Sequence, residues 1–239
     1  MTAAPEIKII GFDADDTLWD NEPYYRSLED VFCEVMKDIL PPEESSKELY
    51  KTEVSNLPLY GYGSKAYTLS ILETALRLSR EQLPAASIAR ILKAGKQLSD
   101  SPLKLLDHVE TVLQKLAPHY KLIVVTKGDL IDQERKLKKS RLERYFHHIE
   151  IMSDKQPGDY EKLFRHLDIR PEEFLMVGNS LRSDILPVVE LGGYAVHIPY
   201  HTTWLHEKVG DIELPAERFR EIASILKLLD ECPWIRLKP

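Results

Sequence analysis

The sequence has few of the features that mark secreted or membrane proteins. Only two cysteines, Cys33 and Cys232, occur among its 239 residues, so a disulfide framework is not expected. No run comes near the roughly 18 consecutive apolar residues of a membrane span. The N-terminus also has no basic segment followed by an apolar one, the pattern of a secretory signal. We therefore expect a cytoplasmic protein with no membrane partner.

Long basic tracts are missing as well, and the formal net charge is −7. Nucleic-acid binding requires clustered Lys and Arg. The short basic stretch at residues 135–141 alternates with Leu137 at helical spacing, which is typical of a solvated helix face. We therefore expect no nucleic-acid partner. Hydrophobic residues make up 43% and charged residues 30%, the balance of a globular protein that buries its own core.

Short apolar runs, each followed by a polar turn, predict buried strands. Runs rich in Ile and Val suit strands that are covered on both faces of a parallel sheet. Four such runs span residues 7–13, 122–126, 174–178 and 194–199, and a weaker candidate lies at 149–152. Stretches with helical periodicity lie between them, at 109–116, 160–167 and 185–191. This alternation predicts a doubly wound, mostly parallel, Rossmann-like α/β sheet.

Residues 21–98 interrupt the alternation. They contain no good strand, but they contain amphipathic stretches at 24–40, 69–78 and 88–98. Proline and glycine residues separate these stretches, as expected between helices. We expect residues 21–98 to form an inserted α-helical cap domain, and residues 1–20 and 99–239 to form the catalytic core.

Polar residues follow the predicted strands, and they are the candidates for chemistry. Ligands of open α/β sheets bind beyond the carboxyl ends of the strands. A single Asp in such a place usually caps a helix or fills a turn. Here carboxylates, a hydroxyl and lysines occur together, which favours a site for phosphoryl transfer. In chain order the candidates are Asp13, Asp15, Thr126, Lys127, Lys155, Asn179 and Asp184.

Phosphoryl transfer needs a positioned nucleophile, a metal ion and donors around the transferred group. The Asp13 carboxylate can attack phosphorus. Asp15 can protonate the leaving oxygen and later activate water. Mg²⁺ prefers a few carboxylates together with water and substrate oxygens, which suits Asp13 and Asp184. Thr126 offers a hydroxyl to the phosphate, and Lys155 would balance the acidic groups.

The residues at these strand ends also carry a family resemblance. The segments DADDTLWD, VVTKGD, SDKQ and VGNSLRSDI resemble, in the same order, the four motifs of the haloacid dehalogenase (HAD) superfamily. The resemblance implies that Asp13 forms an aspartyl-phosphate and that Asp15 is the general acid/base, with its backbone carbonyl on the metal. It implies phosphate binding by Thr126 and Lys155 and metal binding by Asp184. The helical insertion resembles the superfamily's type-one cap.

This resemblance implies a magnesium-dependent phosphatase that acts on a small phosphorylated metabolite. Lys127 and, in the expected cap, Lys65 are further candidates for contacts with the substrate. Lys65 lies in the stretch 60–65, which is either a substrate-selecting surface or an interhelical loop. His201, His206 and Glu207 lack the spacing of a metal site and predict a local hydrogen-bond network.

Asn179 departs from the superfamily pattern, because many members have an acidic residue at this position. An Asn oxygen can still ligate the metal or orient a bound water, but it brings one negative charge fewer, so we expect weaker binding of Mg²⁺. The alternative is a turn residue that tolerates a left-handed φ.

Other functions compete with the phosphatase. A haloacid dehalogenase uses the same nucleophile, but it does not need Asp15 to protonate a halide. A phosphomutase shares both carboxylates and stays open, as does a non-catalytic binding protein on the same fold. A receiver domain is disfavoured because Thr126, not an Asp, ends the second strong run. The sequence does not distinguish a monomer from a homodimer.

Overall fold

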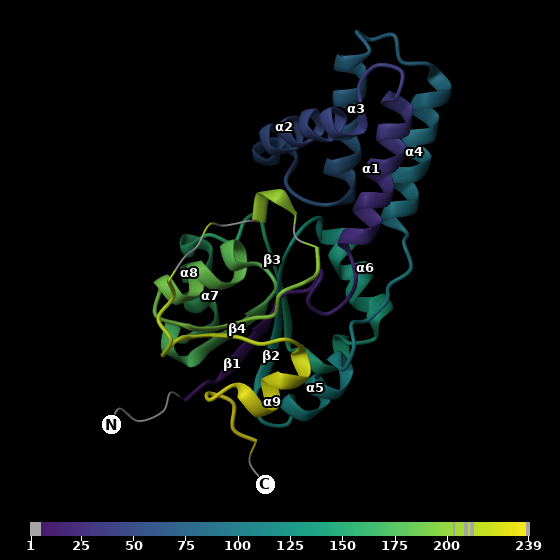
Figure 1. Cartoon of the computed structure of the whole chain (residues 1–239). Helices are drawn as coiled ribbons and strands as arrows, with labels where there is room; N and C mark the ends of the chain where they lie inside the picture. The colour runs from purple at the N-terminus through teal and green to yellow at the C-terminus, as the bar shows by residue number, and fades with distance from the viewer. Residues whose placement is uncertain (1–5, 203, 208–209, 211–212, 238–239) are drawn as a thin grey trace. The chain divides into compact units, whose positions relative to one another are not determined.

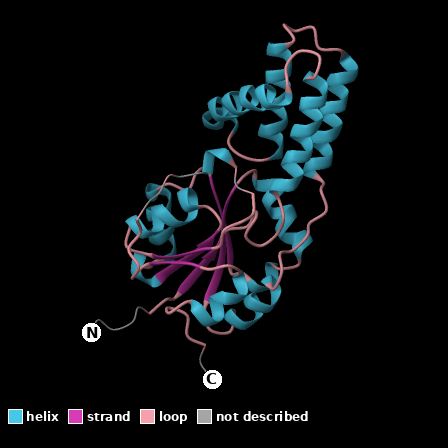
Figure 2. Cartoon of the chain, viewed as in Figure 1, coloured by secondary structure: helices cyan, strands magenta, loops and turns pink. Residues whose placement is uncertain are grey.

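The computed structural model describes residues 6–237 except 203, 208–209 and 211–212. The chain divides into two compact units. The first, called the α/β unit below, consists of residues 1–20, 103–127 and 135–239. The second, called the helical unit, consists of residues 21–102 and 128–134. Figure 2 shows that the strands lie in one unit and that the other is built from helices and loops.

The α/β unit is built on a six-stranded sheet in the order β3-β2-β1-β4-β5-β6, and every neighbouring pair is parallel. The predicted α/β class is therefore confirmed. The strands are β1 (Ile9–Phe12), β2 (Lys121–Lys127), β3 (His148–Met152), β4 (Phe174–Gly178), β5 (Tyr194–His197) and β6 (Phe219–Glu221).

Alternate side chains of the central strands enter different clusters of buried residues, because side-chain direction in a strand has a period of two. Ile10 and Phe12 of β1 belong to the cluster that contains the buried residues of α5 (Val109–Leu116). Ile9 belongs to the cluster that contains residues of α7 (Pro157–Leu167). Figure 1 shows these helices on opposite faces of the sheet. Both faces are thus covered, which explains the continuous apolar runs.

The remaining helices of the α/β unit are short, apart from the end of α6 (Leu130–Ser140). They are α8 (Leu186–Glu190) and α9 (Leu228–Glu231), with the single turns η1 (Glu143–Tyr145), η2 (Pro171–Glu173), η4 (Leu205–Glu207) and η5 (Ile225–Lys227) and the π-helical turn η3 (Leu181–Ile185). Residues 130–134 of α6 are grouped with the helical unit.

The helical unit has its own apolar core, to which Leu28, Phe32, Ile71 and Ile91 contribute. Its helices are α1 (Glu22–Met36), α2 (Pro42–Tyr60), α3 (Ser64–Leu78) and α4 (Ala85–Ser99). Three of them fall within or near the predicted amphipathic stretches, whereas α2 was not predicted. Among the described residues, no helix has the length and apolar character needed to cross a membrane.

Helix α2 escaped prediction because its buried side is mostly polar. Ser45, Thr52 and Asn56 are buried on it, and Leu49 is the buried apolar residue. Asn56 is satisfied by donating to Ser70 Oγ at 3.1 Å and to Glu73 Oε2 at 2.8 Å. Pro42 stands at the start of the helix, where a missing N–H costs nothing. A helix that buries hydroxyls and amides shows no apolar stripe in its sequence.

Candidate active site

The register of the sheet brings the polar residues to one edge. Phe12 pairs with Val124 on one side and with Val177 on the other. The chain segments that follow these residues therefore leave the sheet at the same carboxyl end. Asp13 follows β1 directly and Thr126 is the next-to-last residue of β2. The predicted nucleophile and the predicted phosphate-binding hydroxyl therefore come from neighbouring strands. Both residues are buried.

Lys155 is the centre of this site. Its side chain is 1% exposed, and its Nζ lies 2.5 Å from Asp13 Oδ1 and 2.6 Å from Asp184 Oδ1. Burial lowers the pKa of Lys155, but the two carboxylates outweigh this effect and raise it above its ordinary value. Lys155 is therefore an ammonium ion that joins two carboxylates from different strand ends.

The Asp13 carboxyl is harder to ionise than an ordinary aspartate, because its pKa is raised. Burial raises its pKa, the Lys155 ammonium lowers it and the Asp184 carboxylate raises it again, with a result of about 7. The site thus brings two acidic groups together around one cation. A further cation at this place would stabilise both carboxylates.

Asp184 is fixed by the turn that follows β4. Its Oδ2 accepts a hydrogen bond from the backbone N–H of Ser180 at 2.9 Å, and the residue is 1% exposed. Gly178 is required beside it, because a Cβ there would collide with the Asp184 carboxylate. The Ser180 hydroxyl accepts from the N–H of Ser183 at 3.0 Å and begins the turn η3.

Thr17 and Asn179 surround the second oxygen of Asp13. Thr17 Oγ1 lies 3.1 Å from Asp13 Oδ2 and 3.0 Å from the Asn179 amide. The neighbours of the amide are mainly acceptors, so its nitrogen faces them, 3.2 Å from Asp13 Oδ2 and 3.3 Å from the Asp15 carbonyl oxygen.

The Asp15 side chain is held by two residues that sequence reasoning did not assign to the site. Lys136 Nζ donates to both of its oxygens, at 2.8 Å and 2.9 Å, and Trp19 Nε1 donates to Oδ1 at 2.7 Å. The sequence predicts Lys136 only as part of a solvated helix face. No sequence signal links Lys136 to Asp15, because 121 positions separate them.

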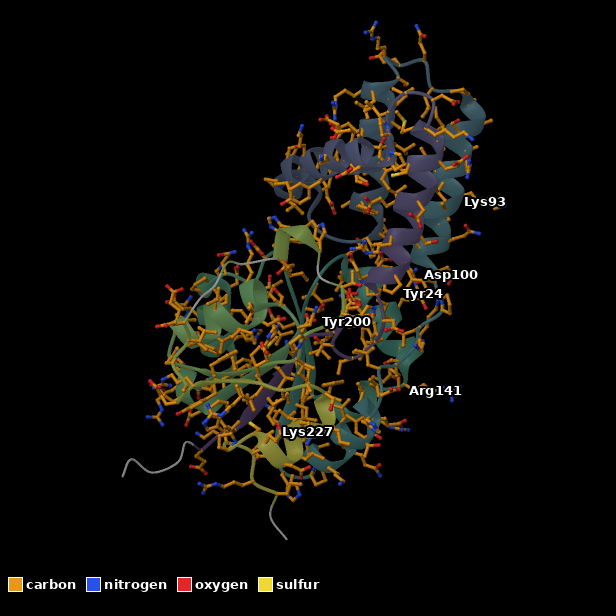
Figure 3. All side chains as sticks on the ribbon, in the orientation of Figure 1. Tyr24, Lys93, Asp100, Arg141, Tyr200 and Lys227 are labelled. Atoms are coloured by element: carbon orange, nitrogen blue, oxygen red, sulfur yellow. The ribbon has the colours of Figure 1, made fainter. Side chains whose placement is uncertain are left out.

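Lys127 forms an ion pair with Glu207, a contact that the sequence did not predict. Lys127 Nζ lies 2.6 Å from Glu207 Oε1 and 2.9 Å from Ser183 Oγ. The other Glu207 oxygen accepts from the hydroxyls of Ser180 and Ser183. Glu207 thus belongs to a hydrogen-bond network, as predicted, in which it contacts Lys127 and the two serines. The same chain segment is tied down by Tyr200 (labelled in Figure 3), whose hydroxyl donates to Asp20 Oδ1 at 2.8 Å.

We expect Glu207→Gln to destabilise the protein in a pH-dependent way. Burial would raise the pKa of Glu207, but Lys127 and the serine hydroxyls lower it to about 2. The ionised group therefore stabilises the fold above its ordinary pKa of 4.5, and this contribution disappears as the pH falls toward 2. Loss of the charged hydrogen bonds should cost about 1.5–3 kcal/mol near neutral pH.

Urea unfolding of the native protein and of Glu207→Gln at several pH values measures this difference. Glu231→Gln is the matched control, because the ion pair of Glu231 with Lys227 is about half exposed on both sides and should contribute little. A Glu207→Gln penalty that stays constant as the pH falls would contradict the prediction.

The two remaining predicted residues, Thr126 and Lys65, belong to different units of the chain. Thr126 is 1% exposed at the end of β2, and its hydroxyl lies 3.2 Å from the carbonyl oxygen of Lys127. Lys65 belongs to the helical unit, where its Nζ lies 2.7 Å from Asp129 Oδ1. Lys65 is therefore part of an ion pair at the start of α3, within one unit of the chain.

The oxygens around Asp13 fit a magnesium ion. Within the described part of the chain, no group of three or more His, Cys, Asp and Glu side chains is arranged to hold a metal. Mg²⁺ does not require such a group, since it is commonly held by one or two carboxylates with water and phosphate oxygens. The Asn179 amide nitrogen, within 3.3 Å of both Asp13 Oδ2 and the Asp15 carbonyl, shows that these ligand candidates converge.

Comparisons with known proteins agree with this geometry. A model of the haloacid dehalogenase-like hydrolase family matches residues 7–192. A curated relative, glyceraldehyde 3-phosphate phosphatase from Pyrococcus furiosus, is 26% identical over 205 residues, which cover 81% of each chain. The crystal structure of a haloacid dehalogenase-like family hydrolase from Xanthomonas campestris is 34% identical, with a TM-score of 0.83, and the match covers 93% of this chain and 89% of that one.

A HAD hydrolase from Bacillus subtilis, whose structure contains magnesium, shares the fold at a TM-score of 0.67 and 16% identity. That match covers 94% of this chain and 97% of the Bacillus chain.

Proposed function

Because the chain belongs to the haloacid dehalogenase-like hydrolase family, we propose that it is a magnesium-dependent phosphatase that hydrolyses a small phosphate monoester through an aspartyl-phosphate on Asp13. Membership of the family makes the protein an enzyme. The observation that carries the proposal is the convergence of Asp13, Lys155 and Asp184 at the carboxyl edge of the sheet, with Asp15 two residues beyond Asp13.

Four groups of this chain would hold the magnesium ion. They are the carboxylates of Asp13 and Asp184, the backbone carbonyl of Asp15 and the side-chain oxygen of Asn179, after rotation of its amide. The bound ion would neutralise charge on the phosphoryl oxygens and keep the phosphorus in line with Asp13. The Lys155 ammonium, whose Nζ lies 2.5 Å from Asp13 Oδ1, would also neutralise negative charge at the site.

The reaction has two steps, with Asp15 acting in both. An oxygen of Asp13 forms a bond to phosphorus while the ester P–O bond breaks, and the Asp15 carboxyl gives its proton to the departing alcohol. In the second step Asp15 takes a proton from water, whose oxygen attacks phosphorus and releases Asp13. Thr126 and backbone amides at the strand ends would bind the phosphoryl oxygens.

Asp15 favours a phosphatase over a dehalogenase, because a leaving alkoxide needs a proton and a halide does not. The Pyrococcus relative is named as a phosphatase of a phosphorylated three-carbon aldehyde. We therefore propose a small phosphorylated metabolite as the substrate, with triose phosphates as the first class to examine. We also infer that residues 21–98 act as a cap domain and that Lys65 is a candidate contact for a second anionic group.

Phosphate release from a panel of sugar phosphates, triose phosphates, nucleotides and phosphoglycolate tests the proposal. Each substrate is measured with magnesium, with a chelating agent and with magnesium restored. Turnover of at least one ester that disappears on chelation and returns with magnesium supports the proposal. Turnover that is unaffected by chelation would contradict the metal requirement.

We expect Asn179→Asp to bind magnesium about tenfold more tightly, because the charge of the ligands tunes the affinity of oxygen sites for divalent cations. Without metal, the new carboxylate would lie next to Asp13 Oδ2, where the amide nitrogen is now 3.2 Å away. The variant should therefore melt at a lower temperature than the native protein in chelator, and the difference should shrink in magnesium. Calorimetric magnesium titration and thermal melts measure both effects. An unchanged affinity for magnesium would show that residue 179 is not in the metal site.

A further inference from the structure

Three hydrogen bonds to the Asp15 carboxylate come from Lys136 and Trp19, neither of which was among the predicted site residues. Two come from Lys136 Nζ, at 2.8 Å and 2.9 Å, and one comes from Trp19 Nε1, at 2.7 Å. All three residues belong to the α/β unit. The two oxygens of one carboxylate are thus both directed toward a single ammonium group, which fixes the plane of the carboxylate.

The indole and the ammonium approach Asp15 from rigid positions. Trp19 is 1% exposed, and its carbonyl oxygen accepts from the N–H of Asp16 at 2.8 Å. Asp16 has a φ of 61°, so the chain turns sharply between Asp15 and Trp19. Lys136 is carried by α6 next to Leu137, which is buried in the core of the α/β unit.

The pair itself is poorly explained as a stabilising contact. About a quarter of each side chain is exposed, 23% for Lys136 and 24% for Asp15. Solvent screens a partly exposed ion pair, so its contribution to folding should be modest. The geometry is nonetheless specific, because a lysine 121 positions away contacts both oxygens of one carboxylate.

We propose that Lys136 is the positioning residue for Asp15, and this inference rests on the proposed function of Asp15 as the general acid/base. A general acid/base must lie within hydrogen-bond reach of the oxygen with which it exchanges its proton. Asp side chains rotate about two bonds, and the contacts to Lys136 and Trp19 restrict both rotations. Without Lys136, the Asp15 carboxyl keeps only part of this restraint and spends less time in the orientation that catalysis uses.

A double-mutant cycle tests the inference. We expect Lys136→Met to lower kcat by about 10- to 100-fold, with KM changed less than kcat and with an unchanged melting temperature. In an Asp15→Asn background the same substitution should cause no further loss, because residues that act as one unit are not additive. Lys136→Arg, which keeps a cationic donor, should recover part of kcat. Lys138→Met, an exposed position on the same helix, is the matched control and should resemble the native protein.

Trp19→Phe gives a second variant, in which the indole donor is lost and the ring is kept. It should also lower kcat, and by less than Lys136→Met, because one of the three contacts is removed. Native kcat in Lys136→Met, or losses from Lys136→Met and Asp15→Asn that multiply, would overturn the positioning role and leave the proposed phosphatase intact. If the native protein shows no magnesium-dependent turnover, the proposed function fails and the role of Lys136 fails with it.

Discussion

Replacement of Asp13 by Asn is expected to abolish turnover, with kcat reduced by at least about 10⁴-fold. Asparagine keeps the size of the side chain and can still accept a hydrogen bond from Thr17, but its amide is not a nucleophile toward phosphorus. It also removes one of the two carboxylates that face Lys155. The fold should persist, because the remaining carboxylate of Asp184 still pairs with the buried ammonium at 2.6 Å.

The measurement is steady-state hydrolysis of a chromogenic phosphate ester in saturating magnesium, combined with thermal melts. Asp159→Asn is a suitable control, because Asp159 pairs with the exposed Lys162 on α7. Activity that survives Asp13→Asn while the protein stays folded would remove Asp13 from the mechanism. The thermal melts show whether the variant is folded, so that a loss of activity can be assigned to the missing nucleophile and not to unfolding.

Replacement of Lys155 by Met is expected to affect both stability and catalysis. It leaves the carboxylates of Asp13 and Asp184 next to each other without the ammonium that now separates them. Breaking a buried ion pair by removing one partner costs about 3–5 kcal/mol. Catalysis should fall as well, because Lys155 contacts the proposed nucleophile directly at Oδ1.

The loss of stability in Lys155→Met should depend on magnesium and on pH. A divalent cation bound by the same two carboxylates would restore part of the lost stability. The pKa of Asp13 is already about 7 with Lys155 present, and loss of the ammonium should raise it further. The carboxyl left without Lys155 should therefore become protonated as the pH falls through a value above about 7. The repulsion, and with it the difference from the native protein, should be largest at alkaline pH and should shrink as the pH falls toward neutral.

Chemical unfolding of Lys155→Met with and without magnesium, at several pH values, measures these effects. Lys162→Met is the control, because Lys162 makes an ion pair in which its own side chain is 71% exposed. A penalty below about 1 kcal/mol, the value of an exposed pair, would contradict the central position assigned to Lys155. A penalty that magnesium does not reduce would argue against a metal ion between Asp13 and Asp184.

Much of the α/β unit could be predicted from the sequence, because its strands are covered on both faces. Such strands are continuous apolar runs, and the polar residue that ends each run marks the edge where ligands bind. The predicted run at 174–178 coincides with β4, and the helix predicted at 109–116 coincides with α5. The predicted HAD-like enzyme is confirmed by the family match. The roles of the individual site residues stay predictions.

The missed elements have physical reasons. Strand β6 has only three residues, Phe219–Glu221, and it lies at the edge of the sheet without full burial. Three residues are too few to show the alternation that distinguishes a strand from a loop. Helix α2 buries polar side chains, and so it lacks the apolar stripe that predicts a helix.

Two contacts at the site were not predicted, because they depend on the tertiary fold. Glu207 meets Lys127 across 80 positions, and Lys136 meets Asp15 across 121. Neither pair has a local motif. Both contacts form only in the folded chain, which brings the strand ends and the surrounding segments together. The motif residues, by contrast, follow strands directly, so their neighbours in sequence reveal them.

Acid quenching of the enzyme during turnover would trap the phosphoryl group that Asp13 is proposed to carry. Asp15→Asn is used with a phosphate ester of a good leaving group, because this variant slows the second step more than the first. We predict a peptide that contains Asp13 and has gained the mass of one phosphoryl group, stable in acid and lost on treatment with hydroxylamine. The double variant with Asp13→Asn should lack it. Release of the leaving group in a stoichiometric burst with no phosphoryl group on the Asp13 peptide, or with one on another residue, would contradict the account.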